Sequence, residues 1–307
     1  MRAAGITALG EPVEILEVDE LAAPAADEVL IDVVAAGVGN WDELVRIGNW
    51  RVGGPAPMAL GTEAAGTVAA VGSGVAEVRE GDEVMTHPLP FRRHGTWAGR
   101  VLAPAATVAP RPSAASWEAS GAFPIPALTA AQALDQALGI ESGGWLVVNG
   151  AGGVTGGLLV QLAAARGARV IATASADKAE RVRGYGASEV LDYHGDWPAL
   201  VREITGGGAP GAVNAARGQA ARTLTAIADG GRIATITGDP PREERGVGVS
   251  DVYVRPDGRQ LSALAELLAC GTLSVPIASV CPLEQAAQAL RQVVGGADGA
   301  IVLSLQT

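Results

Sequence analysis

The sequence predicts an α/β fold built from a small β-barrel and a doubly wound parallel sheet. Between about 145 and 237, apolar runs of strand length alternate with segments of helical length. That alternation is typical of parallel strands joined by helical crossovers. Residues 1 to about 114 instead carry strand-like runs that Gly and Pro interrupt at regular intervals, a pattern that favours a small irregular barrel.

Three segments of the first part are expected to form or begin strands: 28–36, 64–72 and 80–84. After Pro110 the composition shifts, and 117–138 is expected to form helical pieces that Pro124 and Pro126 separate. A domain boundary is therefore expected near 114.

The strands expected in the second part are 145–149, 169–174, 189–192, 212–215 and 232–237. The helices expected between them begin near Gly156 and span 176–184, 197–205 and 218–228. A sheet of this kind binds its ligand across the carboxyl ends of the strands. The tail is expected to return to the first part, with helices at 258–270 and 283–294 and strands at 275–280 and 300–305.

A cluster of glycines separates the first of these strands from its helix. The strand at 145–149 is followed by Gly150-Ala-Gly152-Gly153 and then by an uncharged segment, which the glycines break too often for a membrane span. Such a turn presents backbone N–H groups and the positive end of a helix dipole to an anion, and lets a pyrophosphate approach closely. A chain with 42 glycines forms clusters by chance. The strand at 169–174, however, completes the βαβ unit that a dinucleotide site requires.

Composition bounds the class of partner. The net charge of −11 and the pI near 4.8 argue against a nucleic-acid or acidic-membrane surface. Two cysteines, Cys270 and Cys281, do not make a disulfide framework, and the first residues lead into no signal-type apolar core. We therefore expect a cytoplasmic protein that binds a small molecule.

Short motifs follow one another along nearly the whole chain: Ala35-Ala-Gly-Val, Asp42, Gly61-Thr-Glu-Ala-Ala-Gly66, Ala70-Val-Gly-Ser-Gly-Val, Glu80-Gly-Asp-Glu-Val, Gly95-Thr-Trp-Ala, Leu128-Thr-Ala-Ala-Gln-Ala, the Gly150 turn and Arg255-Pro-Asp-Gly. In order and spacing they resemble the medium-chain dehydrogenase/reductase superfamily, in its zinc-free quinone oxidoreductase branch related to zeta-crystallin. The resemblance implies a GroES-like catalytic β-barrel formed by 1–114 and 259–307. It also implies a Rossmann dinucleotide-binding domain at 115–258 and an active site in the cleft between the two.

The same resemblance bears on metal binding. Zinc-dependent members carry a cysteine and a histidine where this chain has Gly39 and Thr62, and the chain lacks the cysteines of their structural zinc lobe. Zinc catalysis needs three protein ligands, whereas His87, His94 and His194 are scattered along the sequence. We therefore expect no metal, and each histidine is expected to be an ordinary surface or loop residue.

The dinucleotide is expected to be NADPH rather than NADH. NAD-selective sites place Asp or Glu near the end of the second strand, where this chain has Ala174-Ser175. The resemblance implies 2′-phosphate contacts from Ser175, Tyr193 and Lys178, the only lysine in the sequence. The full set of residues expected at the cofactor is Thr129, Gly150, Gly152, Gly153, Val154, Thr155, Ser175, Lys178, Tyr193, Asn214, Ala215, Thr237 and Gly238.

For the chemistry, the resemblance implies hydride transfer to a quinone or an α,β-unsaturated carbonyl, with the proton supplied by solvent. The family asparagine near the nicotinamide ribose aligns with Gly39, so Asn40 either takes that role or belongs to a plain turn. Asp42 either relays a proton or forms hydrogen bonds at a helix start. Tryptophan is more often core packing, but three are candidate walls of an apolar acceptor slot: Trp41, Trp50 and Trp97. The expected catalytic residues are Asn40, Asp42 and Trp50.

Two other functions stay open at this point. One is an enoyl or alkenal reductase that acts on a free or carrier-bound chain, and the other is a non-catalytic, crystallin-like NADPH-binding protein. Residues 249–254 are expected to form a last sheet strand, which in the family often pairs across a dimer axis. A homodimer is therefore expected.

Overall fold

The structure, a computed structural model, describes all residues except 138–142 and 306–307. The chain divides into two compact units: unit 1 contains Met1–Ile125 and Pro256–Thr307, and unit 2 contains Pro126–Arg255. The first limit lies later than the boundary expected near 114. The reason is that helix α2 (Trp117–Gly121) packs on strands of unit 1.

Unit 1 is built mainly on antiparallel strands. They are β1 (Arg2–Ile6), β2 (Glu14–Glu17), β3 (Glu28–Val38), β4 (Met58–Ala59), β5 (Ala64–Val71), β6 (Glu83–Thr86), β7 (Arg100–Pro104), β8 (Val108–Pro110), β15 (Ile277–Pro282) and β16 (Ala300–Ser304). They form two sheets, with orders β2-β1-β4 and β15-β16-β3-β5-β6-β8, and β7 also pairs with β3. Because β16 runs antiparallel to β3, with Ile301 opposite Val38, the tail of the chain does return to the first unit.

The helical segments of unit 1 are α1 (Asn40–Arg46), η1 (Ala105–Thr107), α2, α8 (Gly258–Ala269), η3 (Leu283–Gln285) and α9 (Ala286–Gly295). Helix α3 (Pro124–Ala137) begins at the end of this unit and continues into unit 2. Pro124 and Pro126 were expected to separate helical pieces, but both lie in the first turn of α3. Proline is tolerated there because the first N–H groups of a helix have no helical partner.

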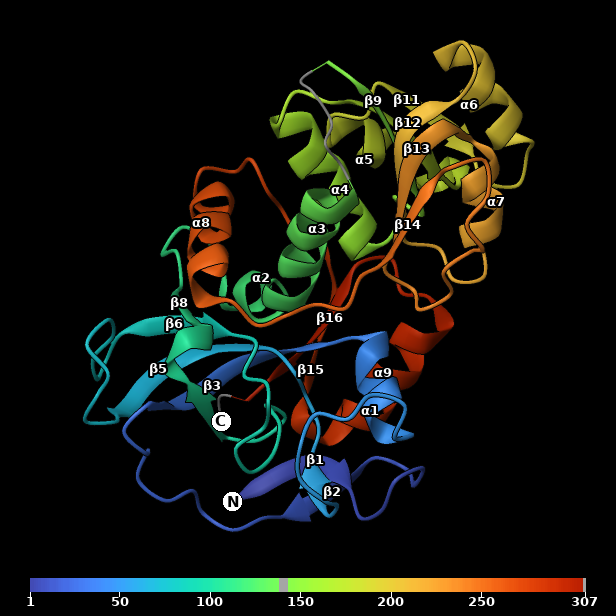
Figure 1. Cartoon of the computed structure of the whole chain (residues 1–307). Helices are drawn as coiled ribbons and strands as arrows, with labels where there is room; N and C mark the ends of the chain where they lie inside the picture. The colour runs from blue at the N-terminus through green and yellow to red at the C-terminus, as the bar shows by residue number, and fades with distance from the viewer. Residues whose placement is uncertain (138–142, 306–307) are drawn as a thin grey trace. The chain divides into compact units, whose positions relative to one another are not determined.

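Unit 2 is a parallel sheet with helices on both faces. Its strands are β9 (Trp145–Asn149), β10 (Arg169–Ala174), β11 (Glu189–Asp192), β12 (Ala209–Asn214), β13 (Ile227–Thr235) and β14 (Gly248–Asp251). All pair in parallel, in the order β11-β10-β9-β12-β13-β14, which is the doubly wound arrangement the sequence predicts. The connecting segments are α4 (Val154–Ala165), η2 (Ala176–Lys178), α5 (Ala179–Gly184), α6 (Trp197–Thr205) and α7 (Ala220–Thr225). Helices α4 and α5 pack on β9 to β11, and α6 and α7 pack on β12 and β13 (Figure 1).

Several boundaries in unit 2 differ from the expectation: β13 begins before 232 and ends at Thr235, and β14 ends at Asp251, before the expected 254. The helix expected at 218–228 is only Ala220–Thr225, because Ile227 already pairs with Ala209 as the first residue of β13. Strand β12 begins three residues before 212, at Ala209, and its register shifts where Pro210 lacks an N–H to donate.

Each unit has its own apolar core. In unit 1 the largest fully buried side chains include Trp97, Ile31 and Leu60, and in unit 2 they include Trp197 and Leu158. None of the helices in the described residues has the length and apolar character to cross a membrane.

Candidate dinucleotide site and buried carboxyl cluster

The glycine turn of unit 2 joins the carboxyl end of β9 to α4. Gly150 has a φ of +89°, in the left-handed region that favours glycine. A Cβ on Gly156 would lie 2.1 Å from the Gly150 carbonyl oxygen, so the helix can approach the turn only because residue 156 is glycine. The chain therefore reverses tightly, and α4 begins at Val154, slightly before the expected start near Gly156.

The N–H groups of this turn divide into two sets. Those of Gly150 and Ala151 are used inside the unit, because they donate to the hydroxyl and carbonyl oxygens of Thr173, each at 2.9 Å. The N–H of Gly152 makes no hydrogen bond within the described part of the chain. The first turn of α4, from Val154, also leaves N–H groups that no helical carbonyl can satisfy. These unpaired groups and the helix dipole fit the pyrophosphate of a dinucleotide.

Two cationic side chains lie against the turn. A Cβ on Gly152 would lie 2.8 Å from Cδ of Lys178, so the lysine side chain passes directly over this glycine. Arg181 donates from Nη2 to the Gly152 carbonyl oxygen at 3.1 Å. Both come from the η2 and α5 segment, which follows β10 and has Ser175 as its N-cap residue. This acidic protein thus concentrates positive charge beside a turn whose geometry fits an anion.

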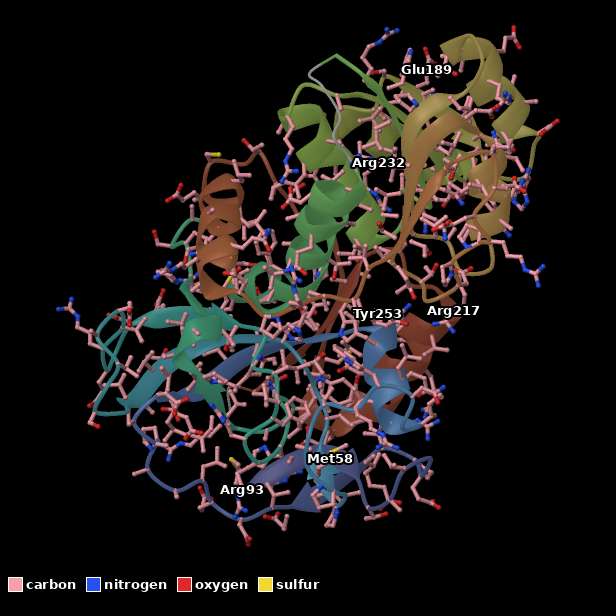
Figure 2. The ribbon with its side chains drawn as sticks, in the orientation of Figure 1. Met58, Arg93, Glu189, Arg217, Arg232 and Tyr253 are labelled. Atoms are coloured by element: carbon pink, nitrogen blue, oxygen red, sulfur yellow. The ribbon has the colours of Figure 1, made fainter. Side chains whose placement is uncertain are left out.

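Other predicted cofactor residues also belong to unit 2. Tyr193 follows β11, is 44% exposed and stacks on His194 with 3.9 Å between ring centroids. Thr129, in α3, is buried. Figure 2 shows Arg217 and Tyr253, which follow β12 and β14, at the carboxyl edge of the sheet, where the predicted residues Ala215 and Gly238 also follow their strands.

Asn214 also ends a strand at this edge, but its side chain is used internally. It is fully buried, and its amide nitrogen donates to the Ala216 carbonyl oxygen at 3.1 Å and to the Thr237 hydroxyl at 3.0 Å. Its amide oxygen accepts from Asn149 at 2.9 Å. Sequence reasoning missed the partner Asn149, although its signal was visible as a polar residue ending an apolar strand beside the glycines.

In unit 1, helix α1 begins over a buried carboxyl group. Asp42 is fully buried, accepts the Gly39 N–H through Oδ2 at 2.8 Å and accepts the Thr62 hydroxyl through Oδ1 at 3.1 Å. Burial raises the pKa of Asp42 from 3.8 to about 7, and the two hydrogen bonds partly oppose that shift. The carboxyl group has the geometry of a residue that fixes a helix start.

Glu63 is a second buried carboxyl group, next to Thr62 in the chain. Its Oε2 accepts the Ile125 N–H at 2.8 Å. Burial raises the pKa of Glu63 well above its ordinary value, and the nearby charge of Asp42 raises it further. Neither carboxyl group is exposed to solvent by more than 1%.

His87 completes this cluster. Its Nδ1 lies 2.7 Å from the Thr62 carbonyl oxygen, which can only accept, so Nδ1 carries the proton. Burial lowers the pKa of His87 to about 4, and Nε2 has no hydrogen-bond partner in the described residues. His87 and His94 lie in loops, as the expectation of surface or loop histidines allows, but both are buried, whereas His194 is exposed.

The environment of Gly39 explains why this chain lacks the asparagine of similar reductases. A Cβ at Gly39 would lie 1.9 Å from Cε2 of Trp41, so the indole ring leaves room for glycine alone. The side chain of Asn40, the first residue of α1, is exposed and makes no hydrogen bond to any described residue. Trp97 is core packing, since it is fully buried and donates to the Gly37 carbonyl oxygen. Trp50 is half-buried and tilted against His87, with 6.1 Å between ring centroids.

Comparisons with known proteins identify the family. Residues 25–113 match the family model "Alcohol dehydrogenase GroES-like domain" and residues 185–303 match "Zinc-binding dehydrogenase". The solved structure of an NAD-dependent alcohol dehydrogenase superposes with a TM-score of 0.89 and is 32% identical over 100% of both chains. The chain belongs to the medium-chain dehydrogenase/reductase superfamily.

Relatives within the superfamily indicate the branch to which this chain belongs. Quinone oxidoreductases of Sus scrofa and Rattus norvegicus are 28% and 30% identical over 92% and 63% of this chain, which correspond to 90% and 59% of their own lengths. The chloroplastic NADPH-dependent alkenal/one oxidoreductase of Arabidopsis thaliana is 34% identical over 54% of this chain, but the match spans only 45% of that relative. The chain is thus an oxidoreductase of the quinone oxidoreductase branch, and its family and glycine turn support a nicotinamide cofactor.

The residues of this medium-chain reductase do not fit a zinc ion. Residues 1–137 and 143–305 contain no group of three or more His, Cys, Asp or Glu side chains that could hold a metal. Near Thr62, both oxygens of Asp42 and the Nδ1 of His87 are already engaged in hydrogen bonds. The zinc-binding description of the matching family model therefore has no counterpart in this donor set.

Proposed function

We propose that the protein is an NADPH-dependent reductase of quinones or α,β-unsaturated carbonyls that works without zinc. The observation that carries the cofactor choice is the passage of Lys178 over Gly152, beside Ser175 rather than an acidic residue. An ammonium group beside the turn attracts a 2′-phosphate, and the missing carboxylate removes a repulsion. When bound, the reduced dinucleotide supplies the hydride.

Each unit has a distinct part in this proposal. The unpaired N–H groups at Gly152 and Val154 bind the pyrophosphate, and Lys178, Ser175 and Tyr193 contact the 2′-phosphate. Asn40 and Trp50 line the acceptor site, where the half-buried indole offers an apolar surface to a flat substrate. The proton comes from solvent, because both oxygens of the buried Asp42 and Oε2 of the buried Glu63 are engaged in hydrogen bonds within unit 1.

The acceptor class rests on the relatives, which are named for quinones and for alkenals or alkenones. The test is oxidation of NADPH with 1,4-benzoquinone, 9,10-phenanthrenequinone and simple enones as acceptors. We expect turnover with at least one class. If NADPH binds by fluorescence titration but none of these acceptors oxidises it above background, the protein is a binding protein and the proposal is wrong.

The cofactor choice has a separate test in Lys178→Ala. Removing the ammonium should raise the KM for NADPH about tenfold or more and leave the KM for NADH nearly unchanged, because only NADPH carries the 2′-phosphate. Arg169→Ala is a matched control, since Arg169 is the first residue of β10 and lies at the amino end of that strand, away from the glycine turn. An equal effect of Lys178→Ala on both cofactors would remove the 2′-phosphate role.

We also infer that the enzyme is a homodimer formed through β14. This strand is the edge of the sheet in unit 2, and Tyr253, just after it, is 68% exposed. An exposed strand edge is ready to pair with a second copy. Light scattering at micromolar concentration should give twice the chain mass of 30.8 kDa, and a mass of one chain would contradict the inference.

A further inference from the structure

Buried polar side chains cross the carboxyl edge of the sheet in unit 2. Asn149, which ends β9, pairs in register with Asn214 at the end of β12, and Asn214 pairs with Thr235 at the end of β13. On the other side, β10 pairs with β9 up to the preceding residue, which places Thr173 beside Asn149. All four are at most 2% exposed. We call them the polar row: Thr173, Asn149, Asn214 and Thr235.

The chemistry of the donors fixes the direction of this row. Thr173 Oγ1 accepts the Gly150 N–H at 2.9 Å, so its own proton goes to Asn149 Oδ1 at 2.6 Å. Asn149 therefore turns its NH₂ group toward Asn214, whose Oδ1 lies 2.9 Å away. Asn214 must then donate from Nδ2, and the Ala216 carbonyl oxygen, which can only accept, agrees with this orientation.

The row ends on one carboxylate. Asn214 Nδ2 donates to the Thr237 hydroxyl at 3.0 Å and to Thr235 at 3.3 Å, and both hydroxyls donate to Asp239 Oδ1. Asp239 Oδ2 accepts the Gly218 N–H at 2.7 Å. One continuous path of hydrogen bonds thus leads from the glycine turn to Asp239, while Asn149 also donates to the Thr223 hydroxyl at 2.9 Å and Asn214 to the Ala216 carbonyl oxygen. An anion at the end of a buried chain of hydrogen bonds strengthens the bonds that lead to it.

We propose that Asp239 is a positioning residue for the dinucleotide, acting through the polar row on the glycine turn. By fixing the amide orientations of Asn214 and Asn149, it keeps the Thr173 oxygen free to accept the Gly150 N–H. That bond holds the turn in the conformation that leaves the Gly152 N–H for the pyrophosphate. The inference rests on the proposed nicotinamide cofactor. It assigns a role in binding that cofactor to Asp239, a residue that itself makes no hydrogen bond to the described glycine turn.

Asp239→Asn is the direct test. Both oxygens of Asp239 accept hydrogen bonds, whereas an asparagine has only one accepting atom, so the variant either loses the Gly218 bond or turns its NH₂ group toward the two hydroxyls and reverses the bonds at this end of the row. We expect the Gly150 amide resonance of the ligand-free protein to move in a ¹⁵N TROSY spectrum. The Kd values for NADPH and NADH should both rise about tenfold, while kcat at saturating cofactor stays within twofold. The matched control is Asp229→Asn, an exposed carboxylate of the same unit that pairs with Arg245.

A pair of variants at Thr173 tests the other end of the row. Thr173→Val keeps the shape of the side chain but removes the hydroxyl. It should move the Gly150 resonance and weaken the binding of NADPH and NADH about as much as Asp239→Asn does. Thr173→Ser keeps the hydroxyl and should restore both readouts. A merely structural role would lower the melting temperature without this rescue pattern in Kd.

The outcomes separate this inference from the proposed function. If wild type binds neither dinucleotide, the proposed function fails. If wild type binds but Asp239→Asn leaves both the Gly150 resonance and the Kd values unchanged, the positioning role of Asp239 is overturned. Should Asp239→Asn fail to fold, the Thr173 pair decides: a Thr173→Val variant with wild-type Kd values overturns the inference, and loss that Thr173→Ser restores supports it.

Discussion

Replacing Asp42 with asparagine should remove a buried group whose ionisation the fold opposes. The asparagine can keep both contacts of the carboxyl group. Its Oδ1 accepts the Gly39 N–H, and its Nδ2 donates to the Thr62 hydroxyl, which can accept as well as donate. The start of α1 should therefore be preserved, and the change in stability should come from charge.

The magnitude follows from the pKa of Asp42, which burial raises from 3.8 to about 7. Between these values the folded protein keeps a proton that the unfolded chain has lost. The free energy of unfolding therefore falls as pH rises through this window and levels off above about pH 7. A rise of roughly 3 pKa units corresponds to about 4 kcal/mol in total, of which about 2.5 kcal/mol falls between pH 5 and pH 8.

Urea denaturation at pH 5 and pH 8 measures this effect. Relative to wild type, Asp42→Asn should gain about 2.5 kcal/mol in unfolding free energy between the two pH values. Asp27→Asn, which alters an exposed carboxylate of the same unit, should show no such gain. A difference between Asp42→Asn and wild type that is the same at both pH values would refute the assignment of a raised pKa to this burial.

Three other changes have outcomes set by the same geometry. Burial lowers the pKa of His87 from 6.5 to about 4, so this residue should contribute a loss of about 3 kcal/mol in unfolding free energy as pH falls from 7 to 4; in pH-dependent denaturation the stability of wild type relative to His87→Gln should fall by that amount over this range. Gly39→Asn should lower the unfolding free energy by about 1–3 kcal/mol, because the Trp41 ring fills the space that the new side chain needs. Adding Trp41→Ala should restore most of that free energy, and an unchanged melting temperature for Gly39→Asn would contradict the clash. Gln132→Ala should cost about 2 kcal/mol in urea denaturation, because this buried amide bonds both the N–H and the carbonyl of Arg255 at 2.9 Å, and a loss under about 0.5 kcal/mol would contradict that role.

The doubly wound sheet is predictable from sequence because its strands are short apolar runs between turn residues. The segments 145–149, 169–174 and 189–192 form strands with those same limits. The expected helix at 218–228 fails at its end, because Ile227 enters the sheet opposite Ala209. Pairing between segments distant in sequence overrides the local preference there, and no local pattern reports it.

In the candidate site, too, features set by local sequence are predictable, and features set by pairing between distant segments are not. Backbone N–H groups that bind an anion leave a local signature, because the turn that exposes them requires glycine at Gly150 and Gly156. The polar row leaves none, since Asn149 and Thr173 become neighbours of one another only through strand register. Similarly, the need for Gly39 depends on where the Trp41 ring lies, which the sequence does not specify.

For Asn214, the position expected from the family differs in meaning from the hydrogen bonds that its side chain makes. The pattern places this residue beside the cofactor because it ends a strand at the carboxyl edge. Its side-chain oxygen, however, accepts from Asn149 and Thr223, and its nitrogen donates to Ala216, Thr235 and Thr237. A fully buried amide engaged in this way has little bonding capacity left for a ligand. In this chain the Asn214 side chain therefore supports the turn that we propose binds the dinucleotide.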